Sequence, residues 1–355
     1  VDAVAALFHR NDGVGHAHGE VVVAFRRSCE RMLIADPEAA ISNHGIGGKF
    51  KDWKAACEAL RQVDVNDHEA VRAFFETHFQ PWQTLNKIEK KVRVKGKGKR
   101  KRTKTVVSYA NTKGMCTGYY DAWMKGSLVQ DEVYTVPVFA PPPDKEKWSR
   151  RQIMTGEWPH NDKAIAYVKS FVDVLYLQIQ GSGVIELPDG RQIRLDWGGK
   201  NGHTYRSVPG ELLRRGIINR SQASMQGVRD WLESHTGDKR TMEAVYANES
   251  YLFFNEIPME DGPKGSEGVV LTPQRSIAVD STRLPYGLPI WLDTSAYGKP
   301  IQRMVVGQDT GIAIRGNKRC DYYWGGGKEG EAMASSMKSP ADSWILLPKP
   351  QVEAP

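Results

Sequence analysis

Residues 305–328 of this chain read VVGQDTGIAIRGNKRCDYYWGGGK. Two carboxylates, Asp309 and Asp321, stand in this stretch, each at the edge of a short apolar run and each followed by glycines. The pattern predicts a strand that ends near Asp309, a turn, and a second strand that carries Asp321 into the aromatic cluster of residues 322–324.

Two acids held at one cleft can differ strongly in pKa. Mutual repulsion and burial against the aromatic residues would raise the pKa of one of them. A carboxyl group that stays protonated near neutral pH can serve as the acid in cleavage of a glycosidic bond. The alternative interpretation is that both aspartates are turn residues, because Asp and Gly are common in turns.

Length and composition predict a two-domain globular protein. The chain has 355 residues, more than a single core usually holds, with 40% hydrophobic and 26% charged residues. No apolar run is long enough to cross a membrane. The chain begins at Val1 rather than Met, which leaves room for an upstream signal peptide or lipid-attachment cysteine.

The positive charge is concentrated in one segment. Residues 87–104 contain eleven Lys or Arg and one Glu, a net charge of +10. The whole chain carries a net charge of +7, so the remaining residues carry −3. The alternation at residues 92–99 predicts an exposed hairpin or a disordered excursion. It could attract an anionic polymer or a membrane surface, or be a solvated loop. Residues 87–108 contain no aromatic residue that could stack on bases, which disfavours nucleic acid.

The four cysteines show no C-x-x-C spacing, which argues against a zinc or redox motif. We therefore expect neither a metal nor an organic cofactor. Cys29 and Cys57 fall on predicted helices, where they form either a disulfide in an oxidising compartment or two buried thiols.

The remaining pattern predicts a mainly β protein with helices. A closed β-barrel is indicated by many short strands separated by turn signals. Strands are expected at residues 134–139, 172–180, 184–187, 192–197, 269, 276–279, 289–292, 304–307 and 344–347. Helices are expected at residues 21–33, 50–60, 66–79, 210–215 and 221–234, the third opening at Asn66 and ended by Pro81.

Several ordered motifs together resemble the membrane-bound lytic murein transglycosylase A family. The resemblance covers residues 74–349. The motifs are Thr117-Gly-Tyr-Tyr, Ile179-Gln-Gly-Ser-Gly, Asn201-Gly-His-Thr-Tyr-Arg-Ser, Ser224-Met-Gln, DSTRLPYG from Asp280, Asp309-Thr-Gly with Asp321, and Trp344-Ile-Leu-Leu-Pro-Lys.

The resemblance implies a double-psi β-barrel catalytic domain, formed by residues 1–122 and 263–355 together with the N-terminal helices. A smaller inserted β-barrel, residues 123–262, would bind glycan, and a groove between the domains would hold the strand. The family cleaves the β-1,4 bond between N-acetylmuramic acid and N-acetylglucosamine in peptidoglycan without adding water, and so leaves a 1,6-anhydro end. The implied setting is the periplasm, as a monomeric lipoprotein on the outer membrane.

By motif, the resemblance implies that Asp321 is the single catalytic acid and then base. The nucleophile is the C6 hydroxyl of the same sugar, so no second carboxylate is needed to activate water. Asp309 would tune the acid, and Asp280 would be a structural acid. The implied substrate-binding residues are Thr117, Tyr119, Gln180, Ser182, Asn201, His203, Tyr205, Arg206 and Trp324. One departure is Ile312, where the family has glycine.

Two other functions compete with this interpretation. Gln308-Asp-Thr-Gly resembles the acid loop of aspartic peptidases, but these enzymes need two aspartates from two copies, and one copy is present here. The chain could also be a non-catalytic protein that binds peptidoglycan or polyanions, with residues 87–104 as the adhesive segment.

Overall fold

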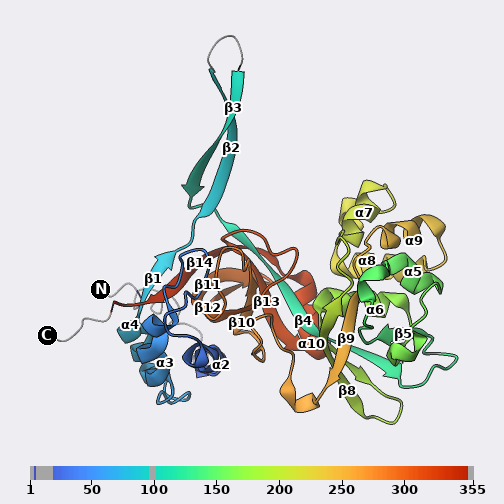
Figure 1. The fold of residues 1–355 in the computed structure, drawn as a ribbon, viewed down its shortest axis with the longest axis horizontal. Helices are drawn as coiled ribbons and strands as arrows, with labels where there is room; N and C mark the ends of the chain where they lie inside the picture. The colour runs from blue at the N-terminus through green and yellow to red at the C-terminus, as the bar shows by residue number, and fades with distance from the viewer. Residues whose placement is uncertain (1–3, 5–18, 96–100, 351–355) are drawn as a thin grey trace. The chain divides into compact units, whose positions relative to one another are not determined.

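The computed structural model of the chain describes residues 4, 19–95 and 101–350 (Figure 1). The chain divides into two compact units: the first unit, residues 1–117, 265–323 and 337–355, and the second unit, residues 118–264 and 324–336. It passes between them within two strands, β4 (Gly114–Ser127) and β13 (Arg319–Gly326). The predicted catalytic and glycan-binding domains, and the groove between them, stay predictions.

A sheet forms the centre of the first unit, with strands bonded in the order β1, β14, β11, β12, β10, β13. All four residues of β10 are buried, as expected for a strand covered on both faces. β10 runs parallel to β12 and antiparallel to β13. Besides β13, the strands are β1 (Phe79–Gln83), β10 (Ser276–Val279), β11 (Pro289–Ala296), β12 (Lys299–Asp309) and β14 (Lys338–Pro348).

Helices near the N-terminus pack together around a buried aromatic cluster in the first unit. The rings of Phe25, Trp53, Phe75 and Phe79 lie in contact, with centroids 5.8 to 6.3 Å apart. A disulfide joins Cys29 to Cys57, which decides between the two alternatives that the sequence leaves open. The elements are α2 (Gly19–Ile34), η2 (Phe50–Trp53), α3 (Lys54–Leu60) and α4 (His68–His78).

The predicted ends of helix α4 are wrong by a few residues. Asp67, not Asn66, caps the helix, because its side chain accepts the Ala70 amide. The helix ends at His78, one residue before the predicted end at Phe79. Phe79 and Pro81 instead belong to β1, where they pair with β14, and the Phe79 side chain is fully buried.

The basic segment folds as a two-stranded antiparallel hairpin, one of the two forms that the sequence predicts. Its strands are β2 (Asn86–Lys95) and β3 (Lys101–Ala110), which pair with each other from Asn86 opposite Ala110 to Lys95 opposite Lys101.

The second unit combines a sheet with helices. Its strands are bonded in the order β4, β7, β8, β9, and β6 pairs with both β4 and β5. The strands besides β4 are β5 (Val136–Phe139), β6 (Ala164–Val168), β7 (Gly183–Glu186), β8 (Gln192–Lys200) and β9 (Leu252–Ile257). The α-helices are α5 (Arg150–Thr155), α6 (Phe171–Gln180), α7 (Val208–Arg214), α8 (Met225–Ser234), α9 (Lys239–Tyr246) and α10 (Gly327–Ser336). Short 3-10 helices lie at Lys145–Lys147, Asn161–Lys163, Arg220–Gln222 and Met259–Asp261.

The strand predicted at residues 172–180 is wrong, since these residues form helix α6. Ser170 and Asp173 make a reciprocal capping box at its start, and Gly181 ends it in the left-handed conformation at φ 90°. Six residues of the helix are buried. A helix buried on most sides carries apolar residues without a clear 3.6-residue period, so this segment resembles a strand in sequence.

The strand expected at Val269 does not form either. The Gly265 amide donates to the Val269 carbonyl (3.0 Å), and Gly268 takes a φ of 86° that favours glycine, so this segment is a turn. The fold is otherwise sheet-rich with helices, as predicted. Among the helices of the described ranges, none combines the length and apolarity needed to cross a membrane.

Candidate active site

The three strands β12, β10 and β13 bring Asp309 and Asp321 to one level of the first unit's sheet. Ala278 of the central strand β10 lies in register with Asp309 on one side and with Asp321 on the other. Neighbouring strands are about 4.8 Å apart, which puts the two aspartates at about 10 Å between Cα atoms. Two acids twelve positions apart in sequence therefore occupy one short stretch of the sheet.

A β-bulge sets the direction of the chain at Asp309. The register of β10 against β12 shifts between Ile277 and Ala278, so one extra residue of β12, Gln308, is accommodated there. The buried Gln308 amide donates to the Ala24 carbonyl and the Ser28 hydroxyl, each at 2.9 Å, which fixes the bulge to helix α2. Asp309, the residue that follows, is half-buried.

Asp321 is held by a chain of side-chain hydrogen bonds. The Thr117 hydroxyl donates to Oδ1 of Asp321 at 2.6 Å. The Arg319 guanidinium donates to the same Thr117 oxygen at 2.8 Å. Because Arg319 occupies an acceptor position of the hydroxyl, the single Thr117 proton is directed at Asp321. Oδ1 is thereby committed to Thr117, and Oδ2 is the oxygen that can carry a transferable proton.

Burial raises the pKa of Asp321 to about 6. The Thr117 hydrogen bond and the positive charge of Arg319 act in the opposite direction, since both favour the carboxylate, while the charge of Asp309 raises the pKa further. The side chain is half-buried rather than sealed. Asp321 is therefore a carboxyl group poised to gain and lose a proton near neutral pH.

Asp309 is fixed by the turn that precedes Gly268. Its Oδ1 accepts the Ser266 amide (2.9 Å), the Ser266 hydroxyl (2.8 Å) and the Thr310 amide (2.8 Å). These bonds tie the end of β12 to residues 265–268. Residues 265–268, which lie outside the sequence motif around Asp321, thus set the orientation of the Asp309 carboxylate.

Asp280 fastens the loop that joins the two acids. It is 2% exposed and accepts the Thr282 hydroxyl (2.6 Å), the Thr282 amide (3.1 Å) and the Gly316 amide (2.7 Å). Burial acts to raise the pKa of Asp280, but these hydrogen bonds, with Arg315 at 3.7 Å, hold it below the ordinary value. These contacts are those of a structural acid.

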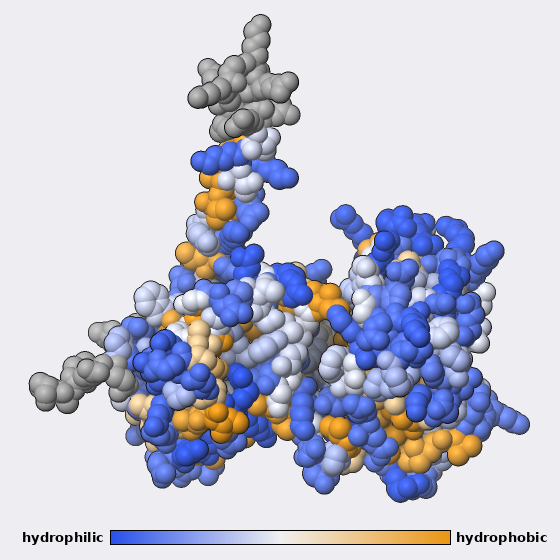
Figure 2. All heavy atoms as spheres, viewed as in Figure 1, coloured by the Kyte–Doolittle hydropathy of each residue, from blue (hydrophilic) through white to orange (hydrophobic). Residues whose placement is uncertain are grey.

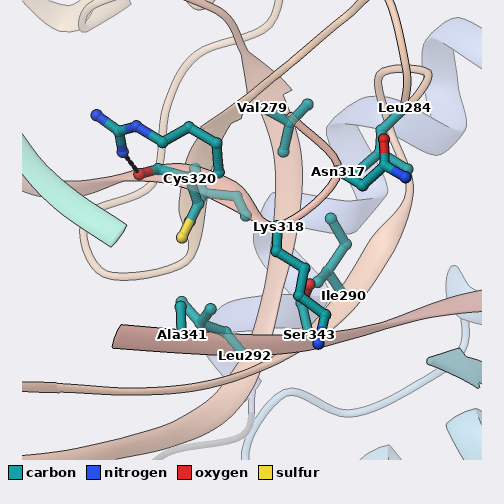
Figure 3. A pocket seen from close by; sticks show the side chains of 11 residues that line it. Val279, Leu284, Ile290, Leu292, Asn317, Lys318, Cys320, Ala341 and Ser343 are labelled. Carbon is teal, nitrogen blue, oxygen red and sulfur yellow. Dashed lines mark hydrogen bonds between the residues drawn. The ribbon is translucent and has the colours of Figure 1, made fainter. Parts of the chain in front are cut away.

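A small cavity lies behind this site in the first unit (Figure 3). Its lining is mostly aliphatic, with the side chains of Val279, Leu284, Ile290 and Leu292 turned toward it. Asp309 and Asp321 are not among the lining residues. The cavity is a gap in the apolar interior and is not part of the site around the two acids. In the part of the chain that the structure describes, no three His, Cys, Asp or Glu side chains come together as metal ligands would.

Comparisons with known proteins show which family this chain is similar to. One family model, the MltA specific insert domain, matches residues 115–255, and another, the 3D domain, matches residues 275–347. The chain is 31% identical to the lytic transglycosylase LtgG of Burkholderia pseudomallei, with 93% of this chain and 90% of that chain covered and a TM-score of 0.56. It is also 31% identical over 245 residues to the membrane-bound lytic murein transglycosylase A of Escherichia coli strain K12.

The chain belongs to the membrane-bound lytic murein transglycosylase A family. The family prediction is confirmed. The alignment with the E. coli K12 protein spans 66% of this chain and 66% of that protein. A crystal structure of E. coli MltA with bound chitohexaose is 23% identical, covers 96% of this chain and 92% of that chain, and has a TM-score of 0.68, which shows a common fold.

In this member of the transglycosylase A family, the other predicted site residues lie in the second unit, apart from Thr117. Trp324 packs over Gly118 so closely that a Cβ there would lie 2.8 Å from the indole ring. Gln180 accepts the Tyr120 amide at 3.1 Å. The Ser182 hydroxyl donates to Asp121 at 2.8 Å, and Arg194 also donates to Asp121. Tyr119 is buried to 9% exposure.

The loop after β8 splits into a buried and an exposed part. Asn201 is 1% exposed, and both amide protons go to backbone carbonyls, of Trp148 (2.8 Å) and Glu249 (2.9 Å). Its position is that of a loop anchor, since its oxygen also accepts the Tyr251 amide. His203 contacts the Glu146 carbonyl at 3.0 Å, whereas Tyr205 and Arg206 are exposed. Their roles as substrate contacts stay predictions.

Sequence reasoning missed the groups that support the acid. Arg319 and Ser266 carry no motif signal of their own. A second disulfide, Cys116–Cys320, was also missed, although each cysteine directly precedes one partner of the Thr117–Asp321 hydrogen bond. The position of each cysteine next to a predicted site residue was the signal that could have indicated this disulfide. Ile312, the departure from the family pattern, is 47% exposed and points into solvent rather than into the packed site.

Proposed function

We propose that this chain is a lytic murein transglycosylase in which Asp321 acts first as acid and then as base. The observation that carries the proposal is a half-buried carboxyl group with a pKa of about 6, one oxygen of which is fixed by Thr117. Its substrate would be the β-1,4 bond between N-acetylmuramic acid and N-acetylglucosamine in peptidoglycan strands. The chitohexaose bound to E. coli MltA supports a glycan ligand.

The first step breaks the glycosidic bond. Protonated Asp321 gives its Oδ2 proton to the leaving O4 while the bond between C1 and O4 breaks, and positive charge develops at C1. The Thr117 hydroxyl strengthens its hydrogen bond to Oδ1 as the carboxylate forms. The positive Arg319 nearby stabilises the same charge.

The second step closes the anhydro ring. The Asp321 carboxylate takes the proton of the muramyl C6 hydroxyl, and O6 attacks C1 of the same sugar, which gives the 1,6-anhydro product and restores the protonated acid. Because the nucleophile belongs to the substrate, no water enters. Asp309, two strands away, would tune the acid through its charge and not transfer a proton itself.

The strand pairings of the first unit support a barrel around this site. In the first unit β13 pairs with β4, and β4 pairs in turn with β14, so the pairings β14, β11, β12, β10, β13, β4 return to their start. We propose that this ring is the double-psi β-barrel of the catalytic domain, and that the inserted domain forms the smaller, glycan-binding barrel. A periplasmic monomer anchored to the outer membrane fits the name of its E. coli relative, which is a membrane-bound lytic murein transglycosylase.

Product mass is the decisive test. Purified sacculi would be incubated with the protein, with Asp321→Asn, and with Asp162→Asn as a control at an exposed aspartate. We expect muropeptides lighter than hydrolytic products by one water with the protein and the control, and a rate at least about a thousandfold lower with Asp321→Asn. Reducing ends would mean that water is the nucleophile. Binding without cleavage by the unmodified protein would favour the non-catalytic alternative.

A further inference from the structure

The β2–β3 hairpin is the most strongly charged feature of the chain. Residues 87–104 carry a net +10, while the whole chain carries +7. The one acid of the segment, Glu89, pairs with Lys87 at 2.6 Å, and the segment contains ten further Lys and Arg residues. The proposed reaction at Asp321 uses none of these residues.

Exposed aliphatic side chains lie among these cations. Val92, Val106 and Val107 are 37%, 43% and 45% exposed, and Tyr109 is 62% exposed. Figure 2 shows hydrophobic residues alternating with hydrophilic ones along this projection. Isolated exposed valines are ordinary, but a ribbon that places several of them beside lysines is a patch of mixed character.

The register assigns these residues to faces. Lys90 lies opposite Val106, and Val92 lies opposite Lys104. Opposed residues share a face, and residues two positions apart on a strand share it too. One face of the hairpin therefore carries two adjacent pairs, each made of one aliphatic residue and one cation.

We propose that the hairpin docks on the surface of a lipid bilayer that contains anionic head groups. Such a surface offers phosphates for the ammonium groups and, directly beneath them, an apolar boundary for the valines. A lysine can lay its stem along that boundary and keep its charge among the head groups. A dissolved polyanion would engage the cations but leave the valines in water. The positive charge of the hairpin and the exposed valines opposite its lysines thus favour an anionic bilayer as the partner.

This inference is independent of the proposed catalytic function. The hairpin residues are far from Asp321 in sequence and have no part in the proposed reaction. The experiment uses the full chain and measures its co-sedimentation with vesicles of phosphatidylcholine alone or of equal parts phosphatidylcholine and phosphatidylglycerol. We expect binding to the anionic vesicles that weakens with added salt. Equal binding to both kinds of vesicle, or to neither, would overturn the proposal.

A charge variant tests the cations. Lys90→Gln/Lys104→Gln should lower the partition coefficient on anionic vesicles by about 25-fold, since each basic residue contributes about fivefold near such a surface. The matched control is Lys54→Gln/Lys299→Gln, which removes the same charge at exposed positions outside the hairpin. If both variants lose the same affinity, the binding depends on net charge and the hairpin is not the docking element.

A second variant separates a bilayer from a dissolved polyanion. Val92→Ser/Val106→Ser keeps every charge, so its binding to heparin and to duplex DNA should equal that of the unmodified protein. Its partition onto anionic vesicles should fall about tenfold, because the valines no longer enter the interface. Unchanged vesicle binding, or tighter binding to DNA or heparin than to vesicles, would replace the bilayer with a polyanion as the partner.

Discussion

Asp280 directly follows β10 and Asp321 lies in the neighbouring strand β13, yet their pKa values move in opposite directions. Burial acts to raise the pKa of both. Asp280 accepts three hydrogen bonds, from Thr282 and Gly316, and these overcome the effect of burial. For Asp321 the structure shows one, from Thr117, among the residues that it describes, and burial prevails.

The comparison shows that the pKa of a carboxyl group depends on its hydrogen-bond donors as well as on its burial. Asp280 is 2% exposed, but its carboxylate accepts hydrogen bonds from several protein groups. Asp321 keeps a less satisfied carboxylate, so protonation costs less free energy. Variants that add or remove single donors or charges should therefore shift the behaviour of either residue in a predictable direction.

The largest expected effect is on stability at Asp280. Asp280→Ala removes the acceptor of the half-buried Gly316 amide and of both Thr282 donors. We expect the free energy of unfolding to fall by about 3 kcal/mol, measured by urea denaturation. Asp162→Ala, at an exposed site, should change it by less than about 0.5 kcal/mol. A loss as small for Asp280→Ala would mean that its hydrogen bonds do not hold the loop.

The next effect is on the pH dependence of the rate. With the pKa of Asp321 at about 6, the protonated fraction falls about tenfold for each pH unit above it, and kcat/KM on soluble glycan strands should follow. Steady-state assays between mildly acidic and mildly alkaline pH check this. A flat profile across that range would show that Asp321 is not the proton donor.

Stability should respond to pH in opposite ways at the two aspartates. The pKa of Asp321 is raised in the folded chain, so its stabilising contribution is present at acidic pH and is lost as pH rises from the ordinary aspartate value to about 6. The pKa of Asp280 is lowered, so its contribution is present at neutral pH and is lost as pH falls through the folded pKa.

A smaller effect is expected at Thr117. Thr117→Val keeps the shape of the side chain but removes the hydrogen bond that favours the Asp321 carboxylate, so the pKa of Asp321 should rise further. The alkaline limb of the pH–rate profile should move up by about 0.5 to 1 pH unit. Thr155→Val removes a hydroxyl from an exposed site and should leave the limb in place. Movement toward lower pH would contradict the role assigned to Thr117.

The smallest effect is expected at Asp309. Asp309→Asn keeps an oxygen to accept from Ser266 and Thr310 but removes the negative charge that raises the pKa of Asp321. The alkaline limb should therefore move down by about 0.3 pH unit. A loss of activity comparable to that of Asp321→Asn, with the pH profile unchanged, would mean that Asp309 takes part in proton transfer itself.

The sequence predicted the strand, turn and strand around Asp309 and Asp321 because apolar runs and glycines mark them locally. It also predicted the hairpin as one of two alternatives, because residues 92–99 alternate with a period of two. It did not predict helix α6, because burial on most sides removes the periodicity that identifies a helix. Capping residues such as Ser170 were the only local sign.

The roles of the acids could be predicted in part only. Motif resemblance pointed to Asp321, but the donors that separate it from Asp280 come from Thr117, Thr282 and Gly316, which reach their partners only through the fold. The Asn201 side chain shows the same limit, since its bonds to the carbonyls of Trp148 and Glu249 join residues about 50 positions apart. Such contacts between distant residues leave no periodic pattern in the sequence.

The Cys116–Cys320 disulfide joins residues 204 positions apart, and each cysteine is the chain neighbour of one partner in the acid's hydrogen bond. A protease that cuts any loop of the intervening chain would therefore leave Thr117 and Asp321 on fragments that remain covalently linked. Cleaved molecules would pass unnoticed through a non-reducing gel. The disulfide would thus keep Thr117 and Asp321 together after proteolytic cleavage. The hydrogen bonds of β4 and β13 could not do so by themselves.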